Sequence, residues 1–224
     1  MANKQNIVQI PALVDLHVHF REPGFSYKET IRTGSLASAA AGYSEVFTMP
    51  NVSPAPDCLD HLKVQQDIIA QDAIIGVHPY ASITMGQKGA GELVDFALLS
   101  PHVPGFSDDG RGIQDETLMR EAMKKCQAIG GLIVAHCEVD DLVKGGYIHE
   151  GEYAKANSHR GISSASEWKE IERDIRLVEQ TGCRFHICHI STKESVALIR
   201  EAKMNGLPVT CETAPHYLLL SDKD

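Results

Sequence analysis

The feature that most constrains the fold is a regular alternation of strand-like and helix-like segments. Short apolar runs recur at intervals of roughly thirty residues, the length of one strand-helix-strand unit, and most intervening segments have apolar residues at helical spacing. The strand-like runs cover about residues 12–19, 44–48, 73–84, 103–107, 132–137, 184–190 and 208–212. The helix-like segments cover residues 28–41, 57–71, 91–99, 115–129, 165–181 and 193–205.

This alternation predicts an α/β protein with a parallel sheet, because strands that are apolar throughout must be covered on both faces. An open doubly wound sheet and a TIM-like (β/α)8 barrel both satisfy the pattern. Polar residues at the carboxyl ends of four different strands favour the barrel, in which those ends converge on one mouth. These residues are His17, His19, Asp109, His136 and His189.

Composition and charge favour a small-molecule substrate. The chain has 224 residues and a formal net charge of -9, whereas binding to nucleic acid or an anionic membrane requires clustered Lys and Arg. The amino-terminal residues lack the apolar core of a signal peptide, and no run approaches the roughly 18 apolar residues of a membrane span. We therefore expect a cytoplasmic protein. Its six cysteines form no Cys-x-x-Cys pair and are expected to be reduced thiols.

A His-x-His pair lies in the first strand-like run, within DLHVHFREPG at residues 15–24. Side chains alternate between the faces of a strand, so His17 and His19 point the same way and can converge on one cation. Two core histidines satisfied by backbone carbonyls are the alternative, but that arrangement buries two polar groups that each need partners. The pair therefore predicts a metal site.

Two later strands end in further histidines, within LIVAHCE and RFHICHIS. By alternation His186 and His189 face opposite ways, so only one of them is expected to look into the barrel. His189 lies at the strand end and is the better candidate. Together with His136 it adds two imidazoles to the predicted site.

Two carboxylates follow the fourth strand-like run in GFSDDG, residues 105–110. Asp-Asp-Gly is also common in turns, but adjacent side chains point apart, so one aspartate can face the metals while the other caps a loop. Imidazoles with a carboxylate suit zinc, and two ions sharing one bridging carboxylate would use all five ligands. The remaining histidines in helical or loop contexts are expected to have no direct role: His61, His78, His102, His149 and His159.

Two further residues form a possible anion site. Arg21 follows the His-x-His pair by two residues, and Asn51 ends the second strand-like run in TMPN. A guanidinium binds a carboxylate in a bidentate manner and a nearby amide can complete the site, although both residues could equally be solvated loop residues. A third segment, about residues 145–166, has neither helical nor strand period; loops of this length are usually functional lids or mobile segments, and we expect it to be the least ordered part of the chain.

These motifs resemble those of the amidohydrolase superfamily, and specifically those of class I dihydroorotases. The resemblance rests on DLHVHFREPG, TMPN, GFSDDG, VAHCE, HICHIS and VTCETAPHYL in this order and covers about residues 12–220. The arginine after the His-x-His pair distinguishes dihydroorotases from hydantoinases. The resemblance implies a TIM-like barrel and the reversible ring closure of N-carbamoyl-L-aspartate to L-dihydroorotate in pyrimidine synthesis.

The same resemblance implies a role for each candidate residue. It assigns His17 and His19 to a first zinc ion, His136 and His189 to a second, and Asp109 to the bridging position that a carboxylated lysine occupies in many relatives. Asp109 is thereby expected to be both a metal ligand and a catalytic residue. Arg21 and Asn51 are expected to hold the free carboxylate of the substrate.

The chain departs from this family pattern in two respects. Only seven strand-like runs precede Asp224, so the catalytic aspartate that the family places after the eighth strand has no counterpart. The flanking β-sandwich is also absent, and a complete barrel needs about 250 residues. We therefore expect residues 1–224 to be one incomplete barrel domain, a fragment of a longer product, that binds zinc weakly and turns over little dihydroorotate.

Three alternatives to a catalytic dihydroorotase stay open at this point. The chain could be another cyclic amidase, either an allantoinase or a dihydropyrimidinase. It could instead be a non-catalytic dihydroorotase-like subunit that partners aspartate transcarbamoylase, although such proteins typically lose metal ligands and this chain keeps five. A homodimer is a further possibility.

Overall fold

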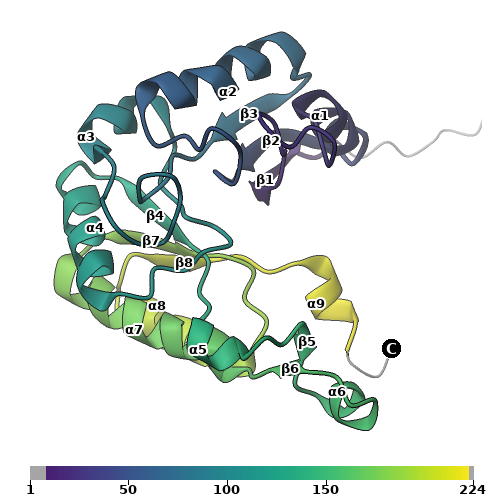
Figure 1. The fold of residues 1–224 in the computed structure, drawn as a ribbon, viewed down its shortest axis with the longest axis vertical. Helices are drawn as coiled ribbons and strands as arrows, with labels where there is room; N and C mark the ends of the chain where they lie inside the picture. Colours follow the sequence, from purple (N-terminus) through teal and green to yellow (C-terminus); the bar gives the residue numbers. More distant parts are fainter. Residues whose placement is uncertain (1–8, 222–224) are drawn as a thin grey trace, which may run out of the picture.

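A computed structural model describes residues 9–221, so part of the amino-terminal segment considered above lies outside the described residues. The main strands form two three-stranded parallel sheets, ordered β1-β2-β3 and β4-β7-β8. In Figure 1 the two sheets follow one another along an arc, with the longer helices on its outside. The strands are β1 (Leu13–Val18), β2 (Tyr43–Thr48), β3 (Gly76–Pro79), β4 (Leu132–Ala135), β7 (Arg184–Ile187) and β8 (Val209–Cys211).

A single residue, Phe106, links the two sheets. It makes parallel bridges to Ala81 after β3 and to Ile133 of β4, at the place predicted for the fourth strand. Pro104 has no N–H to donate, and the N–H of Asp109 donates to the Ser107 hydroxyl. Neither residue can therefore extend the backbone hydrogen bonds that Phe106 begins with the neighbouring strands. The predicted parallel order of seven strand positions is thus confirmed, although the fourth position is not a full strand.

The barrel is not closed over residues 9–221, because no backbone pairing joins β1 to β8 there. Apolar side chains of β1 are correspondingly exposed, including Leu13 at 46% and Val14 at 52%. Leu218 and Leu219 of α9 (Pro215–Leu219) are also exposed. A (β/α)8 barrel is therefore found only as an open arc, as the count of seven strands predicts.

The long helices lie close to their predicted positions, and local chemistry sets their ends. Thr192 accepts the N–H of Ser195 at the start of α8, and Gly182 ends α7 at φ 68, a left-handed conformation that glycine adopts without strain. The helices are α1 (Ile31–Ala40), α2 (Leu59–Asp72), α4 (Glu116–Ala128), α7 (Ala165–Thr181) and α8 (Lys193–Met204).

The helix predicted over residues 91–99 is wrong for most of its length. Only α3 (Phe96–Leu99) forms, followed by the 3₁₀ turn η1 (Ser100–His102). Leu93 instead makes an antiparallel bridge to Thr84, and the Asp95 side chain accepts the N–H of Leu98, so the helix begins after Asp95. The apolar spacing of this segment therefore reflects packing of an extended stretch followed by one helical turn.

The segment at residues 145–166 contains regular structure, contrary to the expectation of an irregular loop. Its two short strands pair in parallel, and a helix of one turn lies between them. Elements this short do not produce a detectable period, which explains why the sequence did not reveal them. This part of the chain comprises α5 (Asp140–Val143), β5 (Ile148–His149), α6 (Glu152–Ala156) and β6 (Gly161–Ile162).

The core has two layers, one on each face of the strands. The larger layer packs between β4, β7 and helices α4, α7 and α8, and includes Ile133 and Phe185. A smaller cluster on the concave face contains Tyr80, Val134 and Cys188 with Met49. All six cysteines are free thiols, and no helix among residues 9–221 is long and apolar enough to span a membrane.

Candidate metal centre

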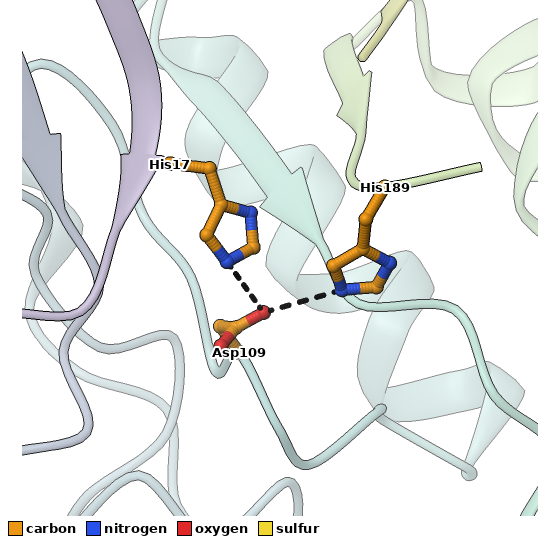
Figure 2. A group of neighbouring side chains, drawn as sticks. All are labelled: His17, Asp109 and His189. Carbon is orange, nitrogen blue, oxygen red and sulfur yellow. Dashed lines mark ion pairs between the residues drawn. The ribbon is translucent and has the colours of Figure 1, made fainter. Parts of the chain in front are cut away.

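The five residues predicted to bind metal meet at the carboxyl ends of strands from both sheets. His17 belongs to β1, while the other four lie just beyond β1, Phe106, β4 and β7. Figure 2 shows the rings of His17 and His189 directed at the same carboxylate oxygen of Asp109. Their Nε2 atoms lie 3.5 and 3.7 Å from Asp109 Oδ1. His19 Nε2 is 3.5 Å from Oδ2, and His136 Nδ1 is 3.7 Å from Oδ1.

Hydrogen bonds on the far side of each ring fix the tautomers of the His-x-His pair. His19 Nδ1 lies 3.0 Å from Asn51 Oδ1, and His17 Nδ1 lies 2.6 Å from Glu212 Oε1. Both oxygens can only accept, so each Nδ1 carries the proton and each Nε2 presents a lone pair. These two Nε2 atoms are 3.2 Å apart. Two lone pairs at that distance repel each other unless a cation lies between them.

The buried carboxylate of Asp109 shows the same need for a cation. Its side chain is 4% exposed, and Oδ1 is buried without a hydrogen-bond partner. Burial alone would raise the pKa of Asp109, but the nearby imidazoles, His189 foremost, hold it at about 2. The group is therefore an anion, which an interior tolerates only when it is paired.

The spacing of the donor atoms fits zinc. Two ligands at about 2.1 Å from a tetrahedral ion lie about 3.4 Å apart, close to the 3.2 to 3.5 Å separations of the His17, His19 and Asp109 donors. The donors of His17, Asp109 and His189 all lie within 4.8 Å of one another. These residues consequently fit a divalent cation.

The second histidine pair lies on the carboxy-terminal side of the site. His136 Nδ1 and His189 Nε2 are 2.9 Å apart, and His136 Nε2 lies 3.7 Å from Glu138 Oε2. Burial tends to lower the pKa of His189, but the Asp109 carboxylate outweighs burial and raises it. Burial lowers the pKa of His19, although the charge of Asp109 opposes this effect. The pKa is therefore shifted down for an imidazole of the first sheet and up for an imidazole of the second.

The expectation that only one of His186 and His189 faces inward is wrong. His186 lies on the concave face, with Nδ1 2.8 Å from Thr210 Oγ1. His189 lies beyond the end of β7, which is Ile187, and its φ of 34 breaks the alternation on which the argument depended. Both residues therefore face the interior of the arc.

Asp108 has the loop-capping role that one of the two aspartates was expected to have. Its carboxylate accepts N–H groups from Ile83, Thr84 and Gly89. Burial raises its pKa to about 6 against the effect of these hydrogen bonds. Asp108 thereby anchors the loop that follows β3, and Asp109 is left to face the histidines.

Arg21 and Asn51 both lie at the His-x-His side of the site. The charge of Arg21 contributes to lowering the pKa of His19, and its half-buried guanidinium makes no hydrogen bond or ion pair with any other residue among 9–221. Asn51 donates from Nδ2 to Asp109 Oδ2 at 3.2 Å, in addition to its contact with His19. One N–H of its amide is still available.

A cavity of about 820 Å³ opens beside His136 and His189. One wall comes from the segment at residues 145–166 and includes Tyr153 and His149, a histidine that was expected to have no direct role. Tyr217 lines the cavity from α9. Its volume is in the range of small-molecule sites.

The sequence reasoning missed Glu212, which contacts His17 at the edge of the site. Burial tends to raise the pKa of Glu212, but contacts with His17 and His186 hold it at about 2. The available signal was its place immediately after β8, where a polar side chain is expected to reach the same mouth as the histidines.

Comparison of the whole chain with known proteins identifies its relatives. A family model described as Dihydro-orotase-like matches residues 6–195. The dihydroorotase of Geobacillus kaustophilus is 49% identical over 230 residues, covering 100% of this chain and 54% of that protein. The dihydroorotase of Bacillus subtilis is 50% identical over 215 residues, covering 96% of this chain and 50% of that protein. The chain thus spans about half the length of these relatives.

Solved structures support the fold. The L-hydantoinase (dihydropyrimidinase) of Arthrobacter aurescens superimposes with a TM-score of 0.77 at 20% identity, covering 95% of this chain and 49% of that one. A dihydropyrimidinase from Brevibacillus agri gives a TM-score of 0.75 at 18% identity, covering 95% of this chain and 48% of that one. By the family match and by sequence identity over nearly its whole length, the chain belongs to the dihydro-orotase-like family.

Proposed function

We propose that the protein is a dihydroorotase, which interconverts N-carbamoyl-L-aspartate and L-dihydroorotate. The observation that carries the proposal is the convergence of four imidazoles on the buried Asp109 carboxylate, with an unpaired guanidinium beside them. Relatives named dihydroorotase, about half of whose length the chain spans, support it.

The metal centre in this proposal holds two zinc ions. His17 and His19 would hold one, His136 and His189 the other, and Asp109 would lie between them. When bound, such ions lower the pKa of a water molecule to about 7 and polarise the ring carbonyl. Zinc is proposed rather than a harder ion because imidazole ligands dominate the site.

The protein's own side chains would orient the substrate and hold the charges in place. Arg21 would bind the free carboxylate of the substrate through two parallel N–H···O hydrogen bonds. The remaining N–H of Asn51 would donate to the same carboxylate, while its other contacts keep His19 oriented. Asp109 would act as the fixed anion that balances the cationic centre, which is the sense in which it is catalytic.

Binding and turnover together test this proposal. Purified zinc-loaded protein is expected to bind L-dihydroorotate, and Arg21→Ala is expected to weaken that binding roughly 10- to 100-fold, the value of a charged hydrogen bond. Turnover of L-dihydroorotate, measured in the same preparation, is expected to fall with the same substitution. Protein that binds no zinc, or that binds L-dihydroorotate equally well without Arg21, would refute the proposal.

The same assay separates the alternative functions. An allantoinase or a dihydropyrimidinase would bind allantoin or dihydrouracil in preference to dihydroorotate and would depend less on Arg21. A non-catalytic subunit would contain no metal and would co-purify with aspartate transcarbamoylase. Retention of all five ligand positions favours the catalytic alternative. A cytoplasmic location, a homodimer and the transcarbamoylase partnership stay predictions.

A further inference from the structure

Glu212 connects the last strand of the arc to the first. It follows β8, and its Oε1 lies 2.6 Å from Nδ1 of His17, a residue of β1 that is 195 positions away in the sequence. Its side chain is 19% exposed and that of His17 is 11% exposed. No backbone pairing joins β1 to β8 among the described residues, so this hydrogen bond connects the two strands through side chains alone.

A second histidine supports Glu212 from the interior of the arc. The side chain of His186 is 5% exposed, and its Nε2 lies within ion-pair distance of Glu212 Oε2, at 3.4 Å, and has no hydrogen-bond partner among the described residues. Thr210 Oγ1 is 2.8 Å from the other ring nitrogen of His186. Glu212 is therefore held between one imidazole at the rim and one imidazole beneath it.

The contact with Glu212 decides which nitrogen of His17 faces the other ligands. A carboxylate can only accept, so the 2.6 Å contact requires the proton on Nδ1. His17 Nε2 is then unprotonated and directed toward Asp109 Oδ1 and His19 Nε2. In the opposite tautomer Nε2 would carry a proton and could not bind a cation.

A different arrangement of the same residues is conceivable. Donor atoms of His17, Cys188 and Glu212 lie within 4.8 Å of one another and could themselves hold a soft metal ion. Cys188 is 2% exposed and packs with Met49, Tyr80 and Val134 in the cluster on the concave face. The ring nitrogens of the other three histidines converge on Asp109 instead, so the contact of Glu212 with His17 is better explained as support for a ligand.

We propose that Glu212 is a positioning residue that fixes the Nδ1–H tautomer of His17 and so directs Nε2 toward a divalent cation. This inference rests on the proposed metal centre and adds a residue to it. Outer partners of metal-bound histidines typically contribute 10- to 100-fold to metal affinity. Glu212 would also restrain β1, because it is the only side chain after β8 that hydrogen-bonds His17 among the described residues.

The experiment compares Glu212→Gln and Glu212→Ala with the matched control Glu45→Gln. Glu45 also contacts a histidine at 2.6 Å, His78, but that pair lies in β2 and β3 and is 44% exposed at both side chains. Zn²⁺ affinity is measured by competition with a chromophoric chelator. Nitrogen-15 NMR of labelled histidines in metal-free protein reports the tautomer of His17 directly, independently of activity.

The expected result is a 10- to 100-fold loss of Zn²⁺ affinity in Glu212→Ala, with His17 shifted toward the Nε2–H tautomer, and no change in Glu45→Gln. Glu212→Gln keeps the side-chain volume, and its amide oxygen can still accept the Nδ1 proton of His17, as Asn51 does for His19, so this variant is expected to retain the tautomer and most of the affinity. Retention in Glu212→Gln ties the loss in Glu212→Ala to the missing acceptor. Unchanged affinity and tautomer in Glu212→Ala would overturn the inference while the metal centre stands.

Two further outcomes address the metal centre itself. If the unmodified protein binds no Zn²⁺, the proposed function fails and this inference fails with it. If Co²⁺-loaded protein shows a thiolate-to-cobalt charge-transfer band that Cys188→Ser abolishes, the metal is bound through Cys188 and Glu212 is a ligand, which also overturns the positioning role.

Discussion

Strands β1 and β7 each bring histidine to the same site, but their surroundings differ. In β1, Leu13, Val14 and Leu16 are 46, 52 and 38% exposed, whereas Phe185 and Ile187 of β7 are fully buried. The carboxy-terminal ligands thus extend from a packed layer, and the amino-terminal ligands extend from a sheet edge. We expect outer hydrogen bonds to contribute most to ligand orientation at the exposed sheet edge, where Glu212 contacts His17 and Asn51 contacts His19.

The largest loss of Zn²⁺ affinity is expected from removing the carboxylate of Asp109, which contacts histidines from both sheets. Asp109→Ala should lower Zn²⁺ affinity by more than the roughly 100-fold that an outer partner contributes, because it deletes the anion between the two histidine pairs. Isothermal titration measures the change, with His78→Asn as the control outside the site. Retained affinity in Asp109→Ala would mean that each sheet binds metal independently.

Metal binding should stabilise the two sheets unequally. At a Zn²⁺ concentration 100 times the dissociation constant, the free energy of unfolding should rise by about 2.7 kcal/mol. Hydrogen exchange should show the greater gain in protection in β1, whose edge is exposed, and the smaller gain in β4 and β7. Equal gains in both sheets would remove the asymmetry on which the comparison depends.

Matched valines test whether the two cores differ in packing. Val46 of β2 and Val209 of β8 are 0 and 3% exposed, but Val46 belongs to a cluster of four buried residues with partly exposed neighbours, whereas Val209 belongs to the larger layer. Val46→Ala should cost about 1.6 kcal/mol, the transfer of two methyl-sized groups, because its surroundings can relax. Val209→Ala should cost more, since a cavity persists among buried neighbours. Urea unfolding measures both, and a larger cost at Val46 would contradict this view.

A buried acidic pair should make stability depend on pH in the carboxy-terminal half. Burial and the neighbouring Asp174 raise the pKa of Glu170 to about 8, despite its contact with Arg173. Between pH 4.5 and 8 the folded protein keeps a proton that the unfolded chain releases, so the free energy of unfolding should fall as pH rises, by at most about 1.4 kcal/mol per pH unit.

Glu170→Gln should reduce this slope, and comparing the two proteins cancels the titration of other groups. Urea unfolding at pH 5, 6.5 and 8 provides the measurement. A free energy of unfolding that depends on pH equally in both proteins would show that Glu170 is ionised throughout the range, and the expected proton uptake would then be absent.

The repeating strand and helix periods predicted the long elements because regular burial leaves a regular pattern. The five ligand positions were predictable from one rule, that polar residues at strand ends converge. The same rule applied to residue 212 would have identified Glu212. The alternation of strand side chains predicted the wrong orientation for the pair His186 and His189, because the backbone at His189 has left the strand and has a positive φ. The residue type of His189 does not indicate that conformation.

Short elements and long-range partners could not be predicted from local patterns. Strands β5 and β6 have two residues each and carry no period. The contact between Glu212 and His17 joins opposite ends of the arc, so it depends on the whole fold. The lack of a hydrogen-bond partner at Oδ1 of Asp109 likewise depends on residues that are distant in the sequence.

Diffraction from zinc-soaked crystals at the zinc absorption edge tests the central claim most directly. The account predicts two anomalous peaks, one bounded by His17 and His19 and one by His136 and His189, with Asp109 between them. Peaks confined to one sheet, or centred away from Asp109, would contradict it.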